Sequence, residues 1–240
     1  MDRKLVEQFV ARLADAWGDE LVSAILYGSA VFDDYRDEVS DFNLLCVLRT
    51  LGPTQLEAGC DAVAWWIKKK QQPPVLMSVS ELNRSSDAFA IELLDIGQSY
   101  EVLHGEDVVG SIKVEPSAHR HQVERELRCG VMRLRDRYLA FQRDRRELTD
   151  LLCDSLPTFA TLLRHAILLG GSTAPLKKQE IFRASAEQLS IDASPFETLL
   201  EVRERRRQLK DTEIRGLFDS YLAEISKAAD YVDRLSVPAS

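Results

Sequence analysis

Four residues that could bind phosphate or a metal ion lie within a short stretch of this 240-residue chain. Gly28 and Ser29 directly follow the apolar run LVSAILY, and Asp41 and Asn43 begin a second apolar run, DFNLLCVL. A glycine lets the backbone approach a phosphate, and free amides at a helix start attract its charge. Residues two apart on a strand share a face, so side chains 41 and 43 would offer oxygen atoms to the same cation. Taken singly, the Gly-Ser pair is an ordinary capped turn and Asp41 a strand start; their joint spacing favours a site.

Hydrophobic periodicity predicts the elements that position these residues. Apolar residues three and four apart predict a first helix that ends at Gly18: Leu5, Val6, Phe9, Val10, Leu13 and Trp17. Short apolar runs predict strands at 21–27, 41–48 and 75–80. A helix begins at Pro53 and stops before Pro73-Pro74, another begins at Ser80-Glu81 and runs toward Gly97, and an extended piece covers 99–108.

Beyond a cluster of Gly110, Ser111 and Pro116, the sequence shows helical patterns only. Helices are predicted at about 119–146, 147–169, 177–189, 195–208 and 211–235. We therefore expect two domains, an α/β (α+β) domain at 1–110 and an all-α antiparallel helical bundle at 111–240.

The order of strand, Gly28-Ser29 and a second strand with Asp41-x-Asn43 resembles the nucleotidyltransferase fold. DNA polymerase β, the aminoglycoside nucleotidyltransferases and small bacterial nucleotidyltransferase-domain proteins share this fold, and the resemblance covers about residues 5–108. It implies a small mixed sheet with flanking helices. It also implies transfer of a nucleotidyl group from a Mg-bound nucleoside triphosphate to a hydroxyl acceptor. Gly28 and Ser29 would bind the phosphates, and Asp41 and Asn43 would be the catalytic residues that face the metal.

The sequence departs from the family pattern at two positions. Residue 43 is asparagine instead of aspartate, and its amide oxygen brings no negative charge to a cation. The run VLMSVS contains no carboxylate before Glu81, although the family usually has a third acid on this strand. We therefore expect weak Mg binding and an activity that is weakened or lost. Two alternatives are a non-catalytic member that binds a nucleotide or a protein, and a structural assembly module.

Other charged residues are weaker candidates for a site. The acids Asp33, Asp34, Asp37 and Glu38 of the connector between the first two strands could replace missing metal ligands, but a solvated connector is the expected role. In the helical half, Glu126 or Glu124 could occupy the position of the glutamate base of aminoglycoside-type relatives. Nine arginines between 120 and 146 form either a solvated helix face or a surface for phosphate or an acidic partner. Trp65 and Trp66 with Lys68 to Lys70 indicate a buried tryptophan and a helix end stabilised by lysine.

Composition narrows the class of protein. The net charge of −8 argues against a dedicated nucleic-acid binder. No apolar run is long enough to span a membrane and the first ten residues are charged, so we expect a cytoplasmic protein that does not bind membranes. Cys46, Cys60, Cys129 and Cys153 form no C-x-x-C pair and are expected to be buried free thiols. The histidines His104, His119, His121 and His165 have no metal-binding spacing, and they are expected to be structural. A homo-oligomer is among the expected states of assembly.

Overall fold

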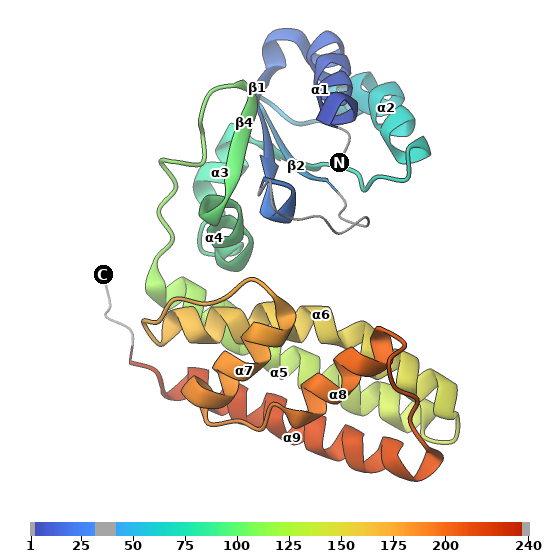
Figure 1. The fold of residues 1–240 in the computed structure, drawn as a ribbon. Helices are drawn as coiled ribbons and strands as arrows, with labels where there is room; N and C mark the ends of the chain where they lie inside the picture. The colour runs from blue at the N-terminus through green and yellow to red at the C-terminus, as the bar shows by residue number, and fades with distance from the viewer. Residues whose placement is uncertain (1–2, 32–41, 237–240) are drawn as a thin grey trace. The chain divides into compact units, whose positions relative to one another are not determined.

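The computed structural model describes residues 3–31 and 42–236, which form two compact units (Figure 1). Unit 1 comprises residues 1–115 and unit 2 residues 116–240, so the division falls a few residues beyond the expected boundary. The observed fold class is the expected one: a small mixed sheet with flanking helices, followed by a helical domain.

Unit 1 contains one four-stranded sheet with the order β3-β2-β1-β4. Its strands are β1 (Leu21–Tyr27), β2 (Asn43–Leu48), β3 (Val75–Ser78) and β4 (Tyr100–Gly105). β1 pairs antiparallel with β2 and β4, whereas β2 pairs parallel with β3. The antiparallel register places Tyr27 opposite both Asn43 and Tyr100. The end of β1 therefore lies between the start of β2 and the start of β4.

Helices cover both faces of the sheet. The helices of unit 1 are α1 (Arg3–Trp17), α2 (Pro53–Lys68), α3 (Val79–Arg84) and α4 (Ala90–Gln98), with 3-10 turns η1 (Gly18–Glu20) and η2 (Gly28–Val31). Successive β2 residues alternate between two cores: Leu44 and Cys46 pack with α1 and α2, whereas Leu45 and Val47 pack with α3 and α4. This alternation is the two-residue period of a strand that is buried on both faces.

The packing of α1 on α2 depends on tryptophan. Trp66 is fully buried and stacks on Phe9 with ring centroids 4.3 Å apart. Trp17 donates a hydrogen bond from Nε1 to the Gln55 carbonyl at 2.7 Å. The prediction of one buried tryptophan is confirmed, because Trp65 is only half-buried and lies beneath the Arg12 guanidinium, 4.5 Å from its ring centroid.

Two predictions in unit 1 were wrong at the level of single elements. The third strand ends at Ser78 instead of Ser80, because the Ser78 hydroxyl accepts a hydrogen bond from the Glu81 amide at 3.1 Å and caps α3. The single helix expected from Ser80 toward Gly97 is two helices. A turn separates them, in which the amides of 88 and 89 bond to the Ser85 carbonyl.

Unit 2 consists of five helices within the described residues: α5 (Pro116–Phe141), α6 (Arg145–Leu169), α7 (Lys178–Leu189), α8 (Ser194–Arg203) and α9 (Asp211–Arg234). The long helices α5, α6 and α9 pack against one another, and α7 and α8 pack on α6. Tyr221 is fully buried at the centre, where its ring lies 5.7 Å from Phe159 and 5.1 Å from Phe196. Its hydroxyl lies 3.0 Å from the Ser155 hydroxyl, so the phenol is satisfied inside the core.

Two predicted helix boundaries in unit 2 were also wrong. The helix predicted at 119–146 ends at Phe141, because the Asp144 carboxylate accepts hydrogen bonds from the amides of Arg146 and Glu147 and caps α6. The helix predicted at 195–208 ends at Arg203, and Arg205 has a left-handed φ of 58° that a helix cannot continue. No helix in the described residues is long and apolar enough to cross a bilayer.

The cysteines are free but not uniformly buried, which corrects the expectation. Cys46 is fully buried, and burial raises its thiol pKa to about 12. Cys129 and Cys153 are half-buried, and Cys60 is exposed on α2. The expectation of burial fails for Cys60, because α2 buries a different face, formed by Gly59, Ala62 and Trp66.

Candidate functional site

The turn after β1 brings backbone groups to one end of the sheet. Gly28 has φ 78°, a left-handed conformation that side chains disfavour. Its amide donates a hydrogen bond to the Ser99 carbonyl at 3.1 Å, which fixes the turn beside the start of β4. Ser29 belongs to the short 3-10 turn η2, so the Gly-Ser pair lies on one turn of 3-10 helix and not at the start of an α-helix.

Asn43 lies directly against this turn. A Cβ atom built on Gly28 would be 3.3 Å from the Asn43 Nδ2 atom, so the side chain at 43 faces the Gly28 backbone. Asn43 is exposed, whereas the residues after it in β2 are buried. Asp41 and the connector acids Asp33, Asp34, Asp37 and Glu38 lie outside the described residues. Two of the four site residues predicted from sequence, Gly28 and Asn43, are thus neighbours at one end of the sheet.

Two acids of α4 add negative charge near this turn. Burial raises the pKa of Tyr27, the residue before Gly28, and the carboxylates of Asp95 and Glu92 raise that pKa further. Glu92 and Asp95 are three residues apart, so they share a face of α4. Sequence reasoning missed both. Their spacing in the sequence shows the shared face, but not that α4 packs beside the end of β1.

The donors described at this end of the sheet do not fit a divalent metal centre. Asn43 supplies a neutral amide oxygen, and β3 contributes Val75, Leu76 and Met77 with no carboxylate. Across residues 3–31 and 42–236, no three His, Cys, Asp or Glu side chains lie close enough to hold a metal ion. A hard cation prefers several charged oxygen ligands.

The glutamates of α5 are held by arginine. Glu124 lies between Arg120, at 3.1 Å, and Arg128, at 2.9 Å, and the Arg128 hydrogen bond lowers the Glu124 pKa. A lowered pKa makes this carboxylate a weaker base. Glu126 lies 3.5 Å from Arg133. Arg128 also reaches Asp230 and Asp233, so these charges connect α5 to α9.

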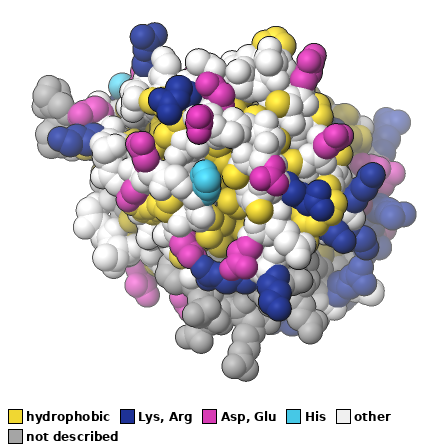
Figure 2. Space-filling view, turned by 90° about the horizontal axis from the view of Figure 1, so that it is seen from above, with side chains coloured by type: hydrophobic (Ala, Val, Ile, Leu, Met, Phe, Trp, Pro, Cys, Tyr) yellow, Lys and Arg dark blue, Asp and Glu magenta, His cyan; other side chains and the backbone are white. Residues whose placement is uncertain are grey.

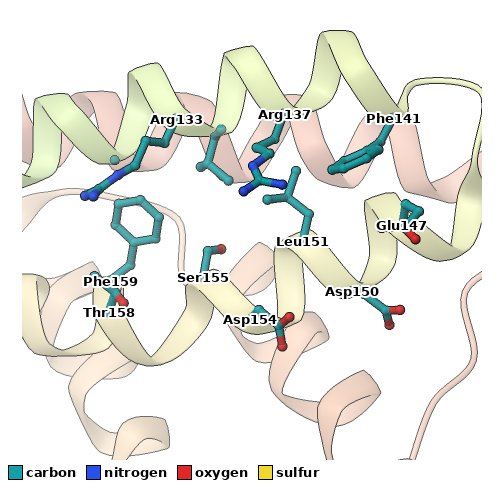
Figure 3. A pocket seen from close by; sticks show the side chains of 12 residues that line it. Arg133, Arg137, Phe141, Glu147, Asp150, Leu151, Asp154, Ser155, Thr158 and Phe159 are labelled. Carbon is teal, nitrogen blue, oxygen red and sulfur yellow. The ribbon is translucent and has the colours of Figure 1, made fainter.

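A pocket of about 420 Å³ lies within unit 2, between α5 and α6. Figure 3 shows Arg133 and Arg137 reaching from α5 toward α6, whereas the carboxylates of Asp150 and Asp154 point away from α5. Arg137 also lies over the Phe141 ring, 5.8 Å from its centroid. The two carboxylates therefore do not face the arginines across the pocket, and the charged side chains that line it do not form a catalytic arrangement.

The histidine pair of unit 2 is part of the core. His119 and His165 are buried, and their ring nitrogens Nε2 and Nδ1 are 2.8 Å apart. Arg164, also buried, lies 3.3 Å from the other ring nitrogen of His165. The prediction that these two histidines are structural agrees with this packing.

The fold is that of a nucleotidyltransferase-like domain followed by a helical domain. A solved structure with this fold is the spectinomycin adenyltransferase AAD(9) from Enterococcus faecialis, determined with ATP and spectinomycin. It matches 96% of this chain and 99% of its own chain, with a TM-score of 0.61 and 14% sequence identity. At this identity the similarity shows the fold alone. No protein-family model and no curated protein matches the sequence.

Proposed function

We propose that unit 1 binds a nucleoside triphosphate at the Gly28 turn, and that nucleotidyl transfer to a hydroxyl acceptor is weakened or lost. The contact between the Gly28 backbone and the Asn43 side chain supports the proposal, because the proposed phosphate-binding turn then lies beside the second motif position. The AAD(9) structure, which contains ATP and spectinomycin, supports a nucleotide and a small-molecule acceptor as ligands.

The proposed roles follow from the chemistry of each group. Gly28 and Ser29 would present backbone amides to the phosphates, as turns with left-handed residues do. In the family reaction an acceptor hydroxyl attacks the α-phosphate and pyrophosphate leaves. Asp41 is proposed as the remaining metal ligand, with Asn43 as a neutral second ligand. Two carboxylates would bind the metal ions more tightly than one carboxylate and one neutral amide. We therefore propose only weak Mg binding.

The test compares two glycines with similar backbones. Gly28 has φ 78° and Gly18 has φ 51°, so alanine at either position strains the backbone in the same way. Gly18 has no atom within 4 Å of a built Cβ, and it follows α1, away from the turn. We expect Gly28→Ala to lose affinity for nucleoside triphosphates in calorimetric titrations, whereas Gly18→Ala keeps it. Equal affinity in both variants and wild type would contradict the proposal.

A non-catalytic nucleotide-binding protein is the second candidate, favoured by the neutral Asn43 and by the absence of acids on β3. A pyrophosphate-release assay with Mg or Mn separates it from the enzyme. Release above the background of the Gly28→Ala variant supports transfer, and nucleotide binding without release supports the binder. Absence of both leaves the assembly module. Glu126→Gln tests the weak candidate base that the resemblance implies, because a lower rate with unchanged nucleotide affinity is the signature of a lost base.

A further inference from the structure

Helix α2 carries an apolar stripe that no described element covers fully. Leu56, Cys60, Val63 and Ile67 are spaced four, three and four residues apart, so they lie on one face of the helix. Leu56 and Ile67 are 48% and 49% exposed, Cys60 is exposed and Val63 is half-buried. Figure 2 shows that apolar side chains reach the molecular surface between acidic and basic ones. Adjacent exposed apolar side chains on one helix face are typical of contact surfaces.

The stripe is not the face that holds α2 in unit 1. That role belongs to Gly59, Ala62 and Trp66, which are buried. A Cβ on Gly59 would be only 2.5 Å from Trp17 Cζ2, so α1 already lies in close contact with this other face. Val63 packs against the margin of this core, but the folding of unit 1 does not explain the exposed Leu56, Cys60 and Ile67.

We propose that the stripe docks antiparallel on the same stripe of a second copy of this chain. The spacing is symmetric about a point between residues 61 and 62. A two-fold axis through that point places Leu56 opposite Ile67 of the second copy and Cys60 opposite its Val63. A two-fold interface must be complementary to itself. The order of residues in this stripe meets that condition, because it is the same when read from either end.

The charges beside the stripe select the antiparallel direction. Glu57 and Lys68 flank it on the same side, both are exposed, and neither forms an ion pair with a described residue. The two-fold axis brings Glu57 within about 3 Å, along the helix axis, of Lys68 of the second copy. A parallel two-fold pair would instead put the Glu57 and Lys68 flanks of the two copies on opposite sides of the contact, so these charges would not meet. Opposite charges thus face each other twice in the antiparallel dimer.

One charge on this flank opposes the dimer. Asp61 lies nearest the axis and faces its own counterpart. Because one helix pair also makes a small interface, the dimer is weak and forms at high protein concentration.

Sedimentation of the full chain over a concentration series measures the dimer, and Cys60 reports its geometry. The two Cys60 residues are offset by three positions, about 4.5 Å along the axis. A direct disulfide needs Cα atoms within about 7 Å, so a short bismaleimide is the better probe. We expect a covalent dimer with wild type and none with Cys60→Ser, which should still sediment as a dimer.

Substitutions on α2 test the arrangement. Leu56→Glu should abolish both the sedimenting and the covalent dimer, whereas Ala58→Glu, on the opposite side of the helix, should abolish neither. Asp61→Asn should strengthen the dimer. Thermal unfolding of each variant verifies the fold, which the exposed positions are expected to tolerate.

Charge reversal provides a second, independent test. Glu57→Lys and Lys68→Glu should each weaken the dimer about tenfold, since each places two like-charge pairs in contact, and the double variant should recover wild-type dissociation. The proposal is overturned by a monomer at every concentration, by a dimer that Leu56→Glu leaves intact, or by a double reversal without recovery.

Discussion

Restoring a carboxylate at residue 43 is the sharpest test of the site in unit 1. Asn43→Asp keeps the side-chain shape and adds one negative charge where the side chain faces the Gly28 backbone. Because Asn43 is exposed, water sets the dielectric constant. A divalent ion about 4 Å from one added charge gains roughly 2 kcal/mol in water, and salt near 0.1 M reduces this to about 1.4 kcal/mol. We therefore expect Mn affinity to rise about tenfold.

Titration calorimetry with Mn measures the change, and a second asparagine supplies the control. Asn83 is exposed on α3, which follows β3 at the end of the sheet where Ser78 pairs with Leu48, opposite to the Asn43 end. Asn83→Asp adds the same charge to the same unit, so it should leave Mn affinity near the wild-type value. If both variants bind Mn equally, residue 43 does not belong to a cation-binding edge and the assignment of the site fails.

Three further changes test the fold. Gly59→Ala should destabilise unit 1 by about 1–3 kcal/mol in urea unfolding, because the added methyl overlaps the Trp17 ring; an unchanged midpoint would mean that α1 and α2 separate easily. Ser78→Ala should lower the free energy of unfolding by about 1 kcal/mol, because it removes the cap of α3, and Ser78→Asp should restore most of that loss. Equal stability of all three proteins would show that the cap does not stabilise the fold. The Glu124 pKa is lowered mainly by Arg128, so its contribution to stability is present above the unfolded pKa near 4.3 and is lost as pH falls through the lower folded value. Melting curves of Glu124→Gln and wild type should differ at pH 7 and converge in acid, and a constant difference at all pH values would rule out this charge as the cause.

The elements predicted from local patterns are those whose pattern and environment agree. Residues 44–48 of β2 form a continuous buried apolar run, and β1 is apolar apart from the buried Ser23. The first helix ends at Trp17 and Gly18 takes a left-handed φ, as the glycine at that position predicted. In these elements the apolar side chains determine both the local structure and the packing. The local sequence is therefore enough to predict them.

Two of the wrong boundaries occur where a polar side chain caps a new helix. Ser78 and Asp144 each bind backbone amides of the residues that follow, and each begins a new helix inside a stretch whose apolar spacing continues. Periodicity counts apolar positions and does not weigh such caps. The exposed Cys60 has a similar cause, because α2 is apolar on two sides and only the tertiary contact of Gly59 with Trp17 decides which side is buried.

The site itself depends on strand order, which local patterns do not contain. β4 pairs with β1, so Ser99 meets Gly28 although about seventy residues separate them. The same pairing leads α4, which ends just before β4, past the end of β1, and the charges of Glu92 and Asp95 then act on Tyr27. Only the assembled sheet shows that these two carboxylates act on Tyr27, the residue that pairs with Asn43.

The charge of residue 43 acts on a bound phosphate as well as on a cation. A triphosphate that approaches Gly28 without a cation meets the side chain at residue 43, and a carboxylate there would repel it. Asparagine removes that repulsion and offers an amide N–H as a donor to phosphate. Asn43→Asp should therefore lower the affinity for metal-free nucleotide while it raises the affinity for Mn. Opposite shifts in the two titrations are expected only if nucleotide and cation share this edge of the sheet.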